Sequence, residues 1–325
     1  MSEHVYVLSP NDPQQMERFK QFAPESAEIV WVDATQSIEQ QAAQLQDATA
    51  IVAAPSVFPV ELAQACPKLR LVQTVSAGTN MIDLVALGEL GIKVANNGGG
   101  NAVAVSEHTI ALMVSVYRKM HLQFQAVKNR QWAGDIRSTW GSDAYELTDK
   151  TVGIIGFGRI GQRVARRLQG WDCKLIYHDV VRFPDELEAS LHVTRVPMDE
   201  LLRTSDIVTL HVPLNRHTEA MISDREFDLM KPTAVLINAC RGPVVDEAAL
   251  IRALRDKKIS AAGLDVLEQE PTPADNPLLD MDNVLVTPHL AAFAQESYDK
   301  SRAFAVQNAA RVARGEEPES VVLPV

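Results

Sequence analysis

Cysteine is scarce in this sequence, which has three among 325 residues. Cys66, Cys173 and Cys240 lie far apart and show none of the short spacings of a cysteine metal site, so we predict no bound metal. An odd number of isolated cysteines is typical of free thiols in a reducing compartment and excludes a disulfide scaffold. The segment Met1–Pro10 also lacks the basic start and apolar run of a secretory signal, so we expect a cytoplasmic protein.

Long hydrophobic runs are absent as well, and positive charge is in deficit. The most apolar stretch, Thr109–Tyr117, is far shorter than the roughly 20 residues that span a bilayer, so no membrane partner is predicted. The chain carries 31 Lys and Arg against 42 Asp and Glu, a formal net charge of -11. The field of such a protein repels phosphate, which argues against nucleic acid as a partner. A small anionic substrate stays possible, because a few local cations outweigh a distant field.

What the sequence does contain is a regular alternation of apolar, strand-like segments and amphipathic, helix-like ones. This alternation is typical of α/β proteins with parallel sheets. A first series fills about the first 100 residues and ends in a glycine-rich break. A long helical pattern then runs from about Val105 to Trp132, and a second α/β series opens at Thr151.

The end of the chain returns to a helical pattern, from about Ala291 to Gly315. Two α/β series with helices between and after them indicate two domains, each with its own doubly wound sheet. We therefore predict that one domain is inserted into the chain of the other. The outer domain comprises residues 1–101 and 291–325, and the inserted domain comprises residues 102–290.

The strongest local motif is a glycine fingerprint, Gly156-x-Gly158-x-x-Gly161, which follows an apolar strand-like segment and opens a helical pattern at Arg159. Gly156 allows a tight turn, Gly158 lets the backbone approach a pyrophosphate, and Gly161 lets the helix pack against the strand. The free N–H groups at the helix start then face the phosphates. In this context the motif predicts dinucleotide binding. A glycine motif outside this context would as often be a glycine-rich turn that binds no ligand.

An acidic residue, Asp179, closes the next strand-like segment at about the 20-residue spacing expected of the carboxylate that binds the adenosine ribose. This carboxylate favours NAD over NADP, because it would repel a 2′-phosphate by roughly 4 kcal/mol at about 4 Å and an effective dielectric of 20. Arg182 lies close enough in sequence to offset part of that repulsion. NAD is therefore the predicted cofactor, with NADP less favoured.

Three later segments carry polar side chains where predicted strands end: Asn238–Gly242, Leu264–Pro271 and Thr287–His289. In an open α/β sheet the carboxyl ends of the strands line the ligand crevice, so we expect these segments to converge. Taken singly, an arginine, a histidine or a glutamate in such loops is more often a surface or structural residue. Their occurrence in this order behind a dinucleotide motif favours a functional role.

With these motifs the chain resembles the D-isomer-specific 2-hydroxyacid dehydrogenases, the family of D-3-phosphoglycerate dehydrogenase, glyoxylate and hydroxypyruvate reductases, and phosphite dehydrogenase. The resemblance covers nearly the whole chain and includes the Ser76–Asp83 loop, the Ser106–Thr109 segment, the glycine fingerprint and the three polar segments in order. It implies a Rossmann-type NAD-binding domain inserted into a flavodoxin-like substrate domain. It also implies a homodimer built around the long helix between the domains.

The resemblance assigns three catalytic residues. It makes Arg241 the ligand of the substrate carboxylate and carbonyl, His289 the acid/base, and Glu270 the partner that orients and charges that histidine. These residue types suit the chemistry, because reduction of a ketone needs a proton at the developing alkoxide and a carboxylate fixes the imidazole tautomer. Arginine offers a planar, permanently charged fork that matches a carboxylate, which lysine does not.

The resemblance also assigns binding residues. Those implied to bind the cofactor are Gly156, Gly158, Arg159, Ile160, Gly161, Asp179, Ala239, Arg241, Asp265 and, less firmly, Thr109. Those implied to bind the substrate are Arg241 and the backbone N–H groups of Ala77 and Gly78, which domain closure would bring to the cofactor.

The predicted function is NAD-dependent interconversion of a small 2-oxo acid and its D-2-hydroxy acid by hydride transfer, with His289 as acid/base. One alternative is the oxidation of phosphite, which needs the same three residues. A second, less favoured alternative is an NAD-sensing binding protein like the C-terminal-binding-protein corepressors. Turnover of 2-oxo acids with NADH, of phosphite with NAD, or of neither separates the three.

Overall fold

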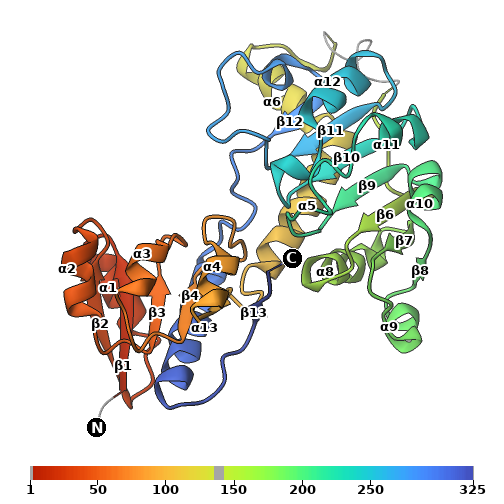
Figure 1. The fold of residues 1–325 in the computed structure, drawn as a ribbon. Helices are drawn as coiled ribbons and strands as arrows, with labels where there is room; N and C mark the ends of the chain where they lie inside the picture. Colours follow the sequence, from red (N-terminus) through yellow and green to blue (C-terminus); the bar gives the residue numbers. More distant parts are fainter. Residues whose placement is uncertain (1–2, 135–142, 325) are drawn as a thin grey trace. The chain divides into compact units, whose positions relative to one another are not determined.

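The computed structural model describes residues 3–134 and 143–324 and divides the chain into two compact units. Unit 1 comprises Met1–Asn101 and Phe293–Val325, and unit 2 comprises Ala102–Ala292. The boundaries predicted from sequence, after residues 101 and 290, coincide with these limits or lie next to them. Figure 1 labels most of the elements of each unit, and the two units are described separately below.

Unit 1 contains a sheet in the order β13-β5-β4-β3-β1-β2, in which only the edge strand β13 is antiparallel. Without β13, this is the flavodoxin-like order 2-1-3-4-5. The prediction of a flavodoxin-like doubly wound domain is therefore confirmed. Its strands are β1 (Glu3–Ser9), β2 (Ala27–Asp33), β3 (Ala50–Ala53), β4 (Leu71–Thr74), β5 (Lys93–Ala95) and β13 (Val321–Val322).

Alternating side chains of the unit 1 strands enter two separate cores, one on each face of the sheet. Val5 and Val7 pack with helix α13 on one face, whereas Tyr6 and Leu8 pack with the helices of the other face. Such two-sided burial explains why these strands are almost continuously apolar in sequence. The helices are α1 (Pro13–Lys20), α2 (Ile38–Gln44), α3 (Val60–Gln64), α4 (Leu84–Glu89) and α13 (Gln295–Ala313).

Unit 2 contains an entirely parallel sheet in the order β12-β11-β10-β9-β6-β7-β8. Counted from β6, this is the Rossmann order 3-2-1-4-5-6 with one further strand, which confirms the predicted fold of the inserted domain. The order reverses between β6 and β9, the place where ligands bind in such sheets. The strands are β6 (Thr151–Ile155), β7 (Lys174–His178), β8 (Val193–Arg195), β9 (Ile207–Leu210), β10 (Val235–Asn238), β11 (Ala261–Leu264) and β12 (Val284–Val286).

The helices of unit 2 flank this sheet, and α5 packs against β10, β11 and β12. The α-helices are α5 (Ala102–Tyr117), α6 (Met120–Lys128), α8 (Arg159–Arg167), α9 (Asp185–Ser190), α10 (Met198–Thr204), α11 (Asp224–Leu229) and α12 (Glu247–Arg255). The 3₁₀ segments are η1 (Leu168–Gly170), η2 (Gly242–Val244) and η3 (Pro277–Asp280). Within the described ranges no helix is both long enough and apolar enough to cross a bilayer.

The single long helix predicted from Val105 to Trp132 is wrong, because the structure has two helices there. Lys119 has a left-handed backbone, with φ of 50°, between α5 and α6. The backbone N–H of Tyr145 donates to the Tyr117 carbonyl at 3.0 Å, so this carbonyl is bound by a residue from a later segment. A tertiary contact therefore ends the helix where the sequence pattern continues.

Candidate active site and cofactor site

The glycine fingerprint forms a tight turn at the carboxyl end of β6, beside β9. Gly156 has φ of 89°, a left-handed conformation that side chains disfavour. A Cβ built on Gly156 would lie 2.6 Å from the carbonyl oxygen of His211, the residue that follows β9. The turn therefore requires glycine at the point where the strand order of the sheet reverses.

Helix α8 begins at this turn with its first N–H groups uncapped by any side chain. A Cβ on Gly161 would lie 2.2 Å from the Gly156 carbonyl oxygen, whereas a Cβ on Gly158 would meet nothing within 4 Å. The helix start is thus held tightly against the turn, and the backbone above Gly158 is open. An open, uncapped helix start that carries Arg159 and Ile160 in its first turn suits the pyrophosphate of a dinucleotide.

Asp179 lies just beyond β7 and is bonded to the glycine turn. Its Oδ2 accepts from the Phe157 N–H at 2.6 Å, and its Oδ1 accepts from the Val181 N–H at 2.8 Å. The Arg182 guanidinium lies 3.2 Å from Asp185 rather than on Asp179. The carboxylate is therefore fixed beside the phosphate-binding turn, where an adenosine ribose would lie.

The segment after β10 is held in shape by Asn238, which is buried. Its Nδ2 donates to the Arg241 carbonyl at 2.9 Å, and its Oδ1 accepts from the Cys240 N–H at 3.0 Å. Burial raises the pKa of the Cys240 thiol to about 11, so it stays protonated near neutral pH and is no nucleophile. Asn238 thus positions Arg241, a role that the sequence analysis did not assign.

Gly242 brings the Arg241 segment against the segment after β11. A Cβ at Gly242 would lie 1.8 Å from the Leu267 carbonyl oxygen, so any side chain there would push the two segments apart. Leu267 in turn donates its N–H to Glu270 Oε1 at 3.0 Å. The structure therefore brings together the two segments that carry Arg241 and Glu270, as the sequence analysis expected.

Glu270 and His289 are in direct contact, with Glu270 Oε2 2.6 Å from His289 Nδ1. The side chains keep 37% and 47% of their surface exposed, so both remain accessible to a ligand. Because a carboxylate only accepts hydrogen bonds, Nδ1 carries the proton in this pair and Nε2 is left to exchange a proton with a bound molecule.

The backbone of His289 is left-handed, with φ of 55°. For a residue with a Cβ this conformation costs about 1–2 kcal/mol. It is held by the His289 N–H, which donates to the Asp265 carbonyl at 2.8 Å and lies 3.0 Å from the Thr287 carbonyl. Strained backbone at such a position is typical of functional sites, and here it aims the imidazole at Glu270.

Asp265 is 1% exposed and binds the segment that follows β12. Its Oδ1 accepts from Thr287 Oγ1 at 2.6 Å and from the Leu290 N–H at 2.9 Å, and its Oδ2 accepts from the Ala291 N–H at 2.8 Å. Burial acts to raise the pKa of Asp265, but the donors, with His108 the foremost, hold that pKa below its ordinary value. The carboxylate is therefore ionised and anchors the backbone on both sides of His289.

Two predicted cofactor residues lie next to this anchored segment. Ala239 packs in a small apolar cluster with Val105 and Ala291, and Ile160 of the α8 start packs against the same cluster. The glycine turn, the Arg241 segment and the His289 segment therefore meet within unit 2. This is the convergence expected of the carboxyl ends of parallel strands.

Thr109, the least firm of the predicted cofactor residues, has no exposed surface. Its hydroxyl donates to the Val105 carbonyl at 2.8 Å within α5. This geometry offers a cofactor no free group, so the structure lends the assignment no support.

The predicted substrate residues Ala77 and Gly78 lie in unit 1, in the loop after β4. Ser76 Oγ lies 2.7 Å from the Gly78 carbonyl oxygen and 2.8 Å from Ser56 Oγ, which fixes the loop. Within the described residues the N–H groups of Ala77 and Gly78 have no hydrogen-bond acceptor. They are available to an anionic ligand.

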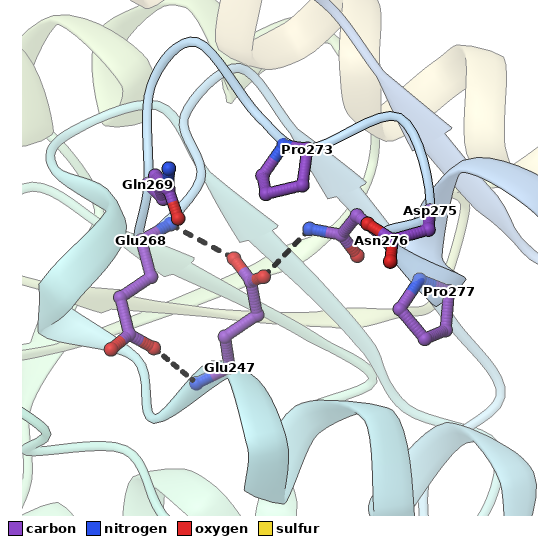
Figure 2. A pocket seen from close by; sticks show the side chains of 7 residues that line it. All are labelled: Glu247, Glu268, Gln269, Pro273, Asp275, Asn276 and Pro277. Atoms are coloured by element: carbon purple, nitrogen blue, oxygen red, sulfur yellow. Dashed lines mark hydrogen bonds between the residues drawn. The ribbon is translucent and has the colours of Figure 1, made fainter.

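A separate pocket of about 360 Å³ lies in unit 2 between α12 and the segment after β11 (Figure 2). Glu247 spans it, accepting from the Glu268 N–H at 2.8 Å and from Asn276 Nδ2 at 2.7 Å. With Asp275 also in the lining, the pocket is acidic and disfavours a 2-oxo acid anion. None of the predicted site residues lines it, and the described residues contain no metal-binding cluster.

The sequence comparisons identify the family. The model for the NAD binding domain of D-isomer specific 2-hydroxyacid dehydrogenases matches residues 110–291. A glyoxylate reductase of Korarchaeum cryptofilum is 37% identical over 265 residues, which cover 81% of this chain and 78% of that protein. The chain belongs to the D-isomer specific 2-hydroxyacid dehydrogenase family.

Solved structures of this family share the fold over the whole chain. D-Mandelate dehydrogenase of Rhodotorula graminis superposes with a TM-score of 0.86 at 26% identity, covering 99% of this chain and 97% of that one. D-Lactate dehydrogenase of Lactobacillus jensenii, solved with NAD+, gives a TM-score of 0.80 at 30% identity, covering 98% and 99%. This dehydrogenase is therefore a nicotinamide-dependent oxidoreductase of 2-hydroxy acids.

Proposed function

We propose that the enzyme interconverts a short 2-oxo acid, such as glyoxylate or hydroxypyruvate, and its D-2-hydroxy acid, with NAD as the cofactor and His289 as the acid/base. The observation that carries this proposal is the 2.6 Å contact between His289 Nδ1 and Glu270 Oε2. It is the arrangement that proton transfer to or from a substrate oxygen needs. The glyoxylate reductase of Korarchaeum cryptofilum supports the choice of substrate.

The proposed roles follow from the contact between His289 Nδ1 and Glu270 Oε2, which leaves His289 Nε2 to face the substrate. The glycine turn from Gly156 to Gly161 and Asp179 would hold the dinucleotide, which would provide hydride transfer to or from C2 of the substrate. In reduction, His289 Nε2 donates a proton to the oxygen of the former ketone; in oxidation it accepts the hydroxyl proton. Glu270 holds the proton on Nδ1 and stabilises the imidazolium that exists before proton donation and after proton removal.

Arg241 is the proposed ligand of the substrate carboxylate. Its backbone is fixed by Asn238 and by the close approach of Gly242 to Leu267. Its Nη1 donates to the Cys240 carbonyl at 2.5 Å, and the planar guanidinium has further donors that suit a carboxylate. Its charge opposes the repulsion from a protein of net charge -11. Ala77 and Gly78 of unit 1 remain predicted donors to the same carboxylate.

Asp179 supports NAD over NADP. Its carboxylate is fixed at the glycine turn, and Arg182 contacts Asp185 instead. A 2′-phosphate about 4 Å from this carboxylate would be repelled by roughly 4 kcal/mol at an effective dielectric of 20. We therefore expect NADH to be preferred by at least about tenfold in kcat/KM.

Two further expectations accompany the proposal. The family resemblance predicts a homodimer, which sedimentation equilibrium tests. The scarce, isolated cysteines predict a cytoplasmic location, which remains the second expectation.

A substrate panel tests the proposal. Glyoxylate, hydroxypyruvate, pyruvate and phenylglyoxylate are assayed with NADH and with NADPH, and phosphite is assayed with NAD. We expect turnover of at least one short 2-oxo acid with NADH and formation of the D-hydroxy acid. Turnover of phosphite alone would favour phosphite oxidation, and NADH binding without turnover of any compound would favour a sensing role; either result contradicts the proposal.

A further inference from the structure

A second histidine of unit 2, His108, lies behind the His289 segment. It is on α5, and its side chain is 25% exposed. His108 Nε2 is 3.0 Å from Thr287 Oγ1 and 3.4 Å from Asp265 Oδ1. It therefore touches both residues that anchor the backbone around His289, although it lies far from them in sequence.

The proton positions in this cluster follow from its chemistry. Thr287 has one hydroxyl proton, and the contact of 2.6 Å from its Oγ1 to the ionised Asp265 carboxylate uses it, because a carboxylate only accepts. Thr287 Oγ1 must then accept from His108, so His108 carries a proton on Nε2. The result is a directed chain from His108 Nε2–H through the Thr287 hydroxyl to Asp265 Oδ1.

Of the described residues that donate to the Asp265 carboxylate or pair with it, His108 is the one whose side chain can carry a positive charge. From the segment after β12 the carboxylate receives the Thr287 hydroxyl and the N–H groups of Leu290 and Ala291, which are neutral donors. Glu107, the neighbour of His108 on α5, turns instead to Arg167 of α8, at 3.1 Å. His108 is also the first of the donors that hold the pKa of Asp265 down.

We propose that His108 is a positioning residue for catalysis: through Thr287 and Asp265 it holds the His289 backbone in the left-handed conformation that aims the imidazole at Glu270. The inference deepens the proposed function and rests on it, because it presupposes that His289 exchanges the proton. His108 itself is linked to the reacting atoms only through other residues.

Two substitutions separate positioning from simple packing. His108→Leu keeps an apolar body of similar size but removes the donor, whereas His108→Gln keeps an N–H donor near the Nε2 position. We expect His108→Leu to lower kcat about tenfold, the effect of losing one hydrogen bond of about 1.4 kcal/mol, and His108→Gln to regain most of it. His217→Gln, at an exposed histidine of the same unit, is the control and should match wild type.

The pH dependence of kcat/KM separates the two explanations, because a packing defect would not shift it. Loss of the His108 donor raises the pKa of Asp265, so Asp265 takes up its proton, and the anchor fails, at a higher pH. Measured in the direction of reduction, in which His289 must be protonated, the acid limb of kcat/KM should therefore shift to higher pH in His108→Leu and return toward wild type in His108→Gln. Thr287→Val and Thr287→Ser repeat the comparison at the middle of the chain, should either His108 variant fail to fold.

The outcomes are distinct from those for the proposed function. A wild-type kcat and acid limb in His108→Leu, or equal losses in His108→Leu and His108→Gln and in both Thr287 variants, would overturn the positioning role while leaving His289 in place. If instead His289→Gln keeps wild-type turnover, the proposed function itself fails.

Discussion

Two carboxylates in the segment after β11 behave in opposite ways. Asp265 is 1% exposed, receives hydrogen bonds from a hydroxyl and two backbone N–H groups, and lies 3.4 Å from His108. Glu270 keeps 37% of its side chain exposed and binds the His289 imidazole and the Leu267 N–H. The buried carboxylate fixes the backbone, and the exposed one meets the group that does the chemistry.

The difference follows from the cost of burying charge. An ionised carboxylate without water needs a full set of donors, and once it has them it holds those donors in one geometry. A carboxylate at the surface keeps water for its remaining lone pairs, so its partner can change protonation state during turnover. The buried carboxylate should therefore matter for stability and activity together, and the exposed one for activity.

The largest effect is expected at the exposed pair. His289→Gln should lower kcat by roughly 10² to 10⁴, because it removes proton transfer and leaves the cofactor site intact. The Kd of NADH, from fluorescence titration, should stay within about twofold, since the glycine turn and Asp179 are untouched. A variant within a few-fold of wild type in kcat would remove His289 from the acid/base role.

Substitution of the buried carboxylate, Asp265, should lower stability as well as activity. Asp265→Asn replaces one of the two acceptor oxygens by an NH2 group and so leaves the Leu290 or the Ala291 N–H without its acceptor, which should lower the free energy of unfolding by about 1–3 kcal/mol, with a fall in kcat. Urea denaturation measures the first effect. Asp224→Asn, which breaks an exposed ion pair with Arg252, is the matched control and should change stability by no more than about 1 kcal/mol. Equal losses in both variants would contradict the comparison.

An effect confined to acid pH is expected in the pH dependence of stability, where His211 enters. Burial lowers the pKa of this histidine to about 3. Below about pH 6.5 this histidine binds a proton in the unfolded chain but not in the folded one. The free energy of unfolding therefore falls by up to about 1.4 kcal/mol for each pH unit of acidification. His211→Gln should flatten the decline of Tm between about pH 6 and 4.

Asp265 acts over a lower range. Its folded pKa is lowered, so its contribution is present above its unfolded pKa of about 3.9 and is lost as pH falls through the folded value. Asp265→Asn should therefore alter the slope of Tm only below about pH 4. If the slope of Tm against pH is unchanged in His211→Gln, or is altered above pH 5 in Asp265→Asn, these assignments are wrong. His217→Gln serves as the neutral control.

Much of the fold could be predicted because short sequence motifs determine its turns and strand ends. The glycine spacing from Gly156 to Gly161 and the polar residues at strand ends place the turn and the three converging segments without any knowledge of long-range contacts. The carboxylate–imidazole pair of Glu270 and His289 was reached through family resemblance. The structure adds its geometry, which no spacing gives.

What the sequence could not show depends on contacts between distant residues. The end of α5 is set by the Tyr145 N–H on the Tyr117 carbonyl, and nothing near Lys119 signals a break. Likewise, His108 meets Thr287 only because α5 packs against β11 and β12. Asn238 did have a local signal, a polar residue closing a buried strand, which could have marked it as structural.

The central claim, that Glu270 acts through His289, is tested most directly by a double-mutant cycle in kcat/KM. Glu270→Gln, His289→Gln and the double variant are compared with wild type under one set of conditions. We expect Glu270→Gln to lower kcat/KM about a hundredfold in the wild-type enzyme and by less than about twofold once His289 is already glutamine. Equal losses in both backgrounds would mean that the two side chains act independently, and the account would fail.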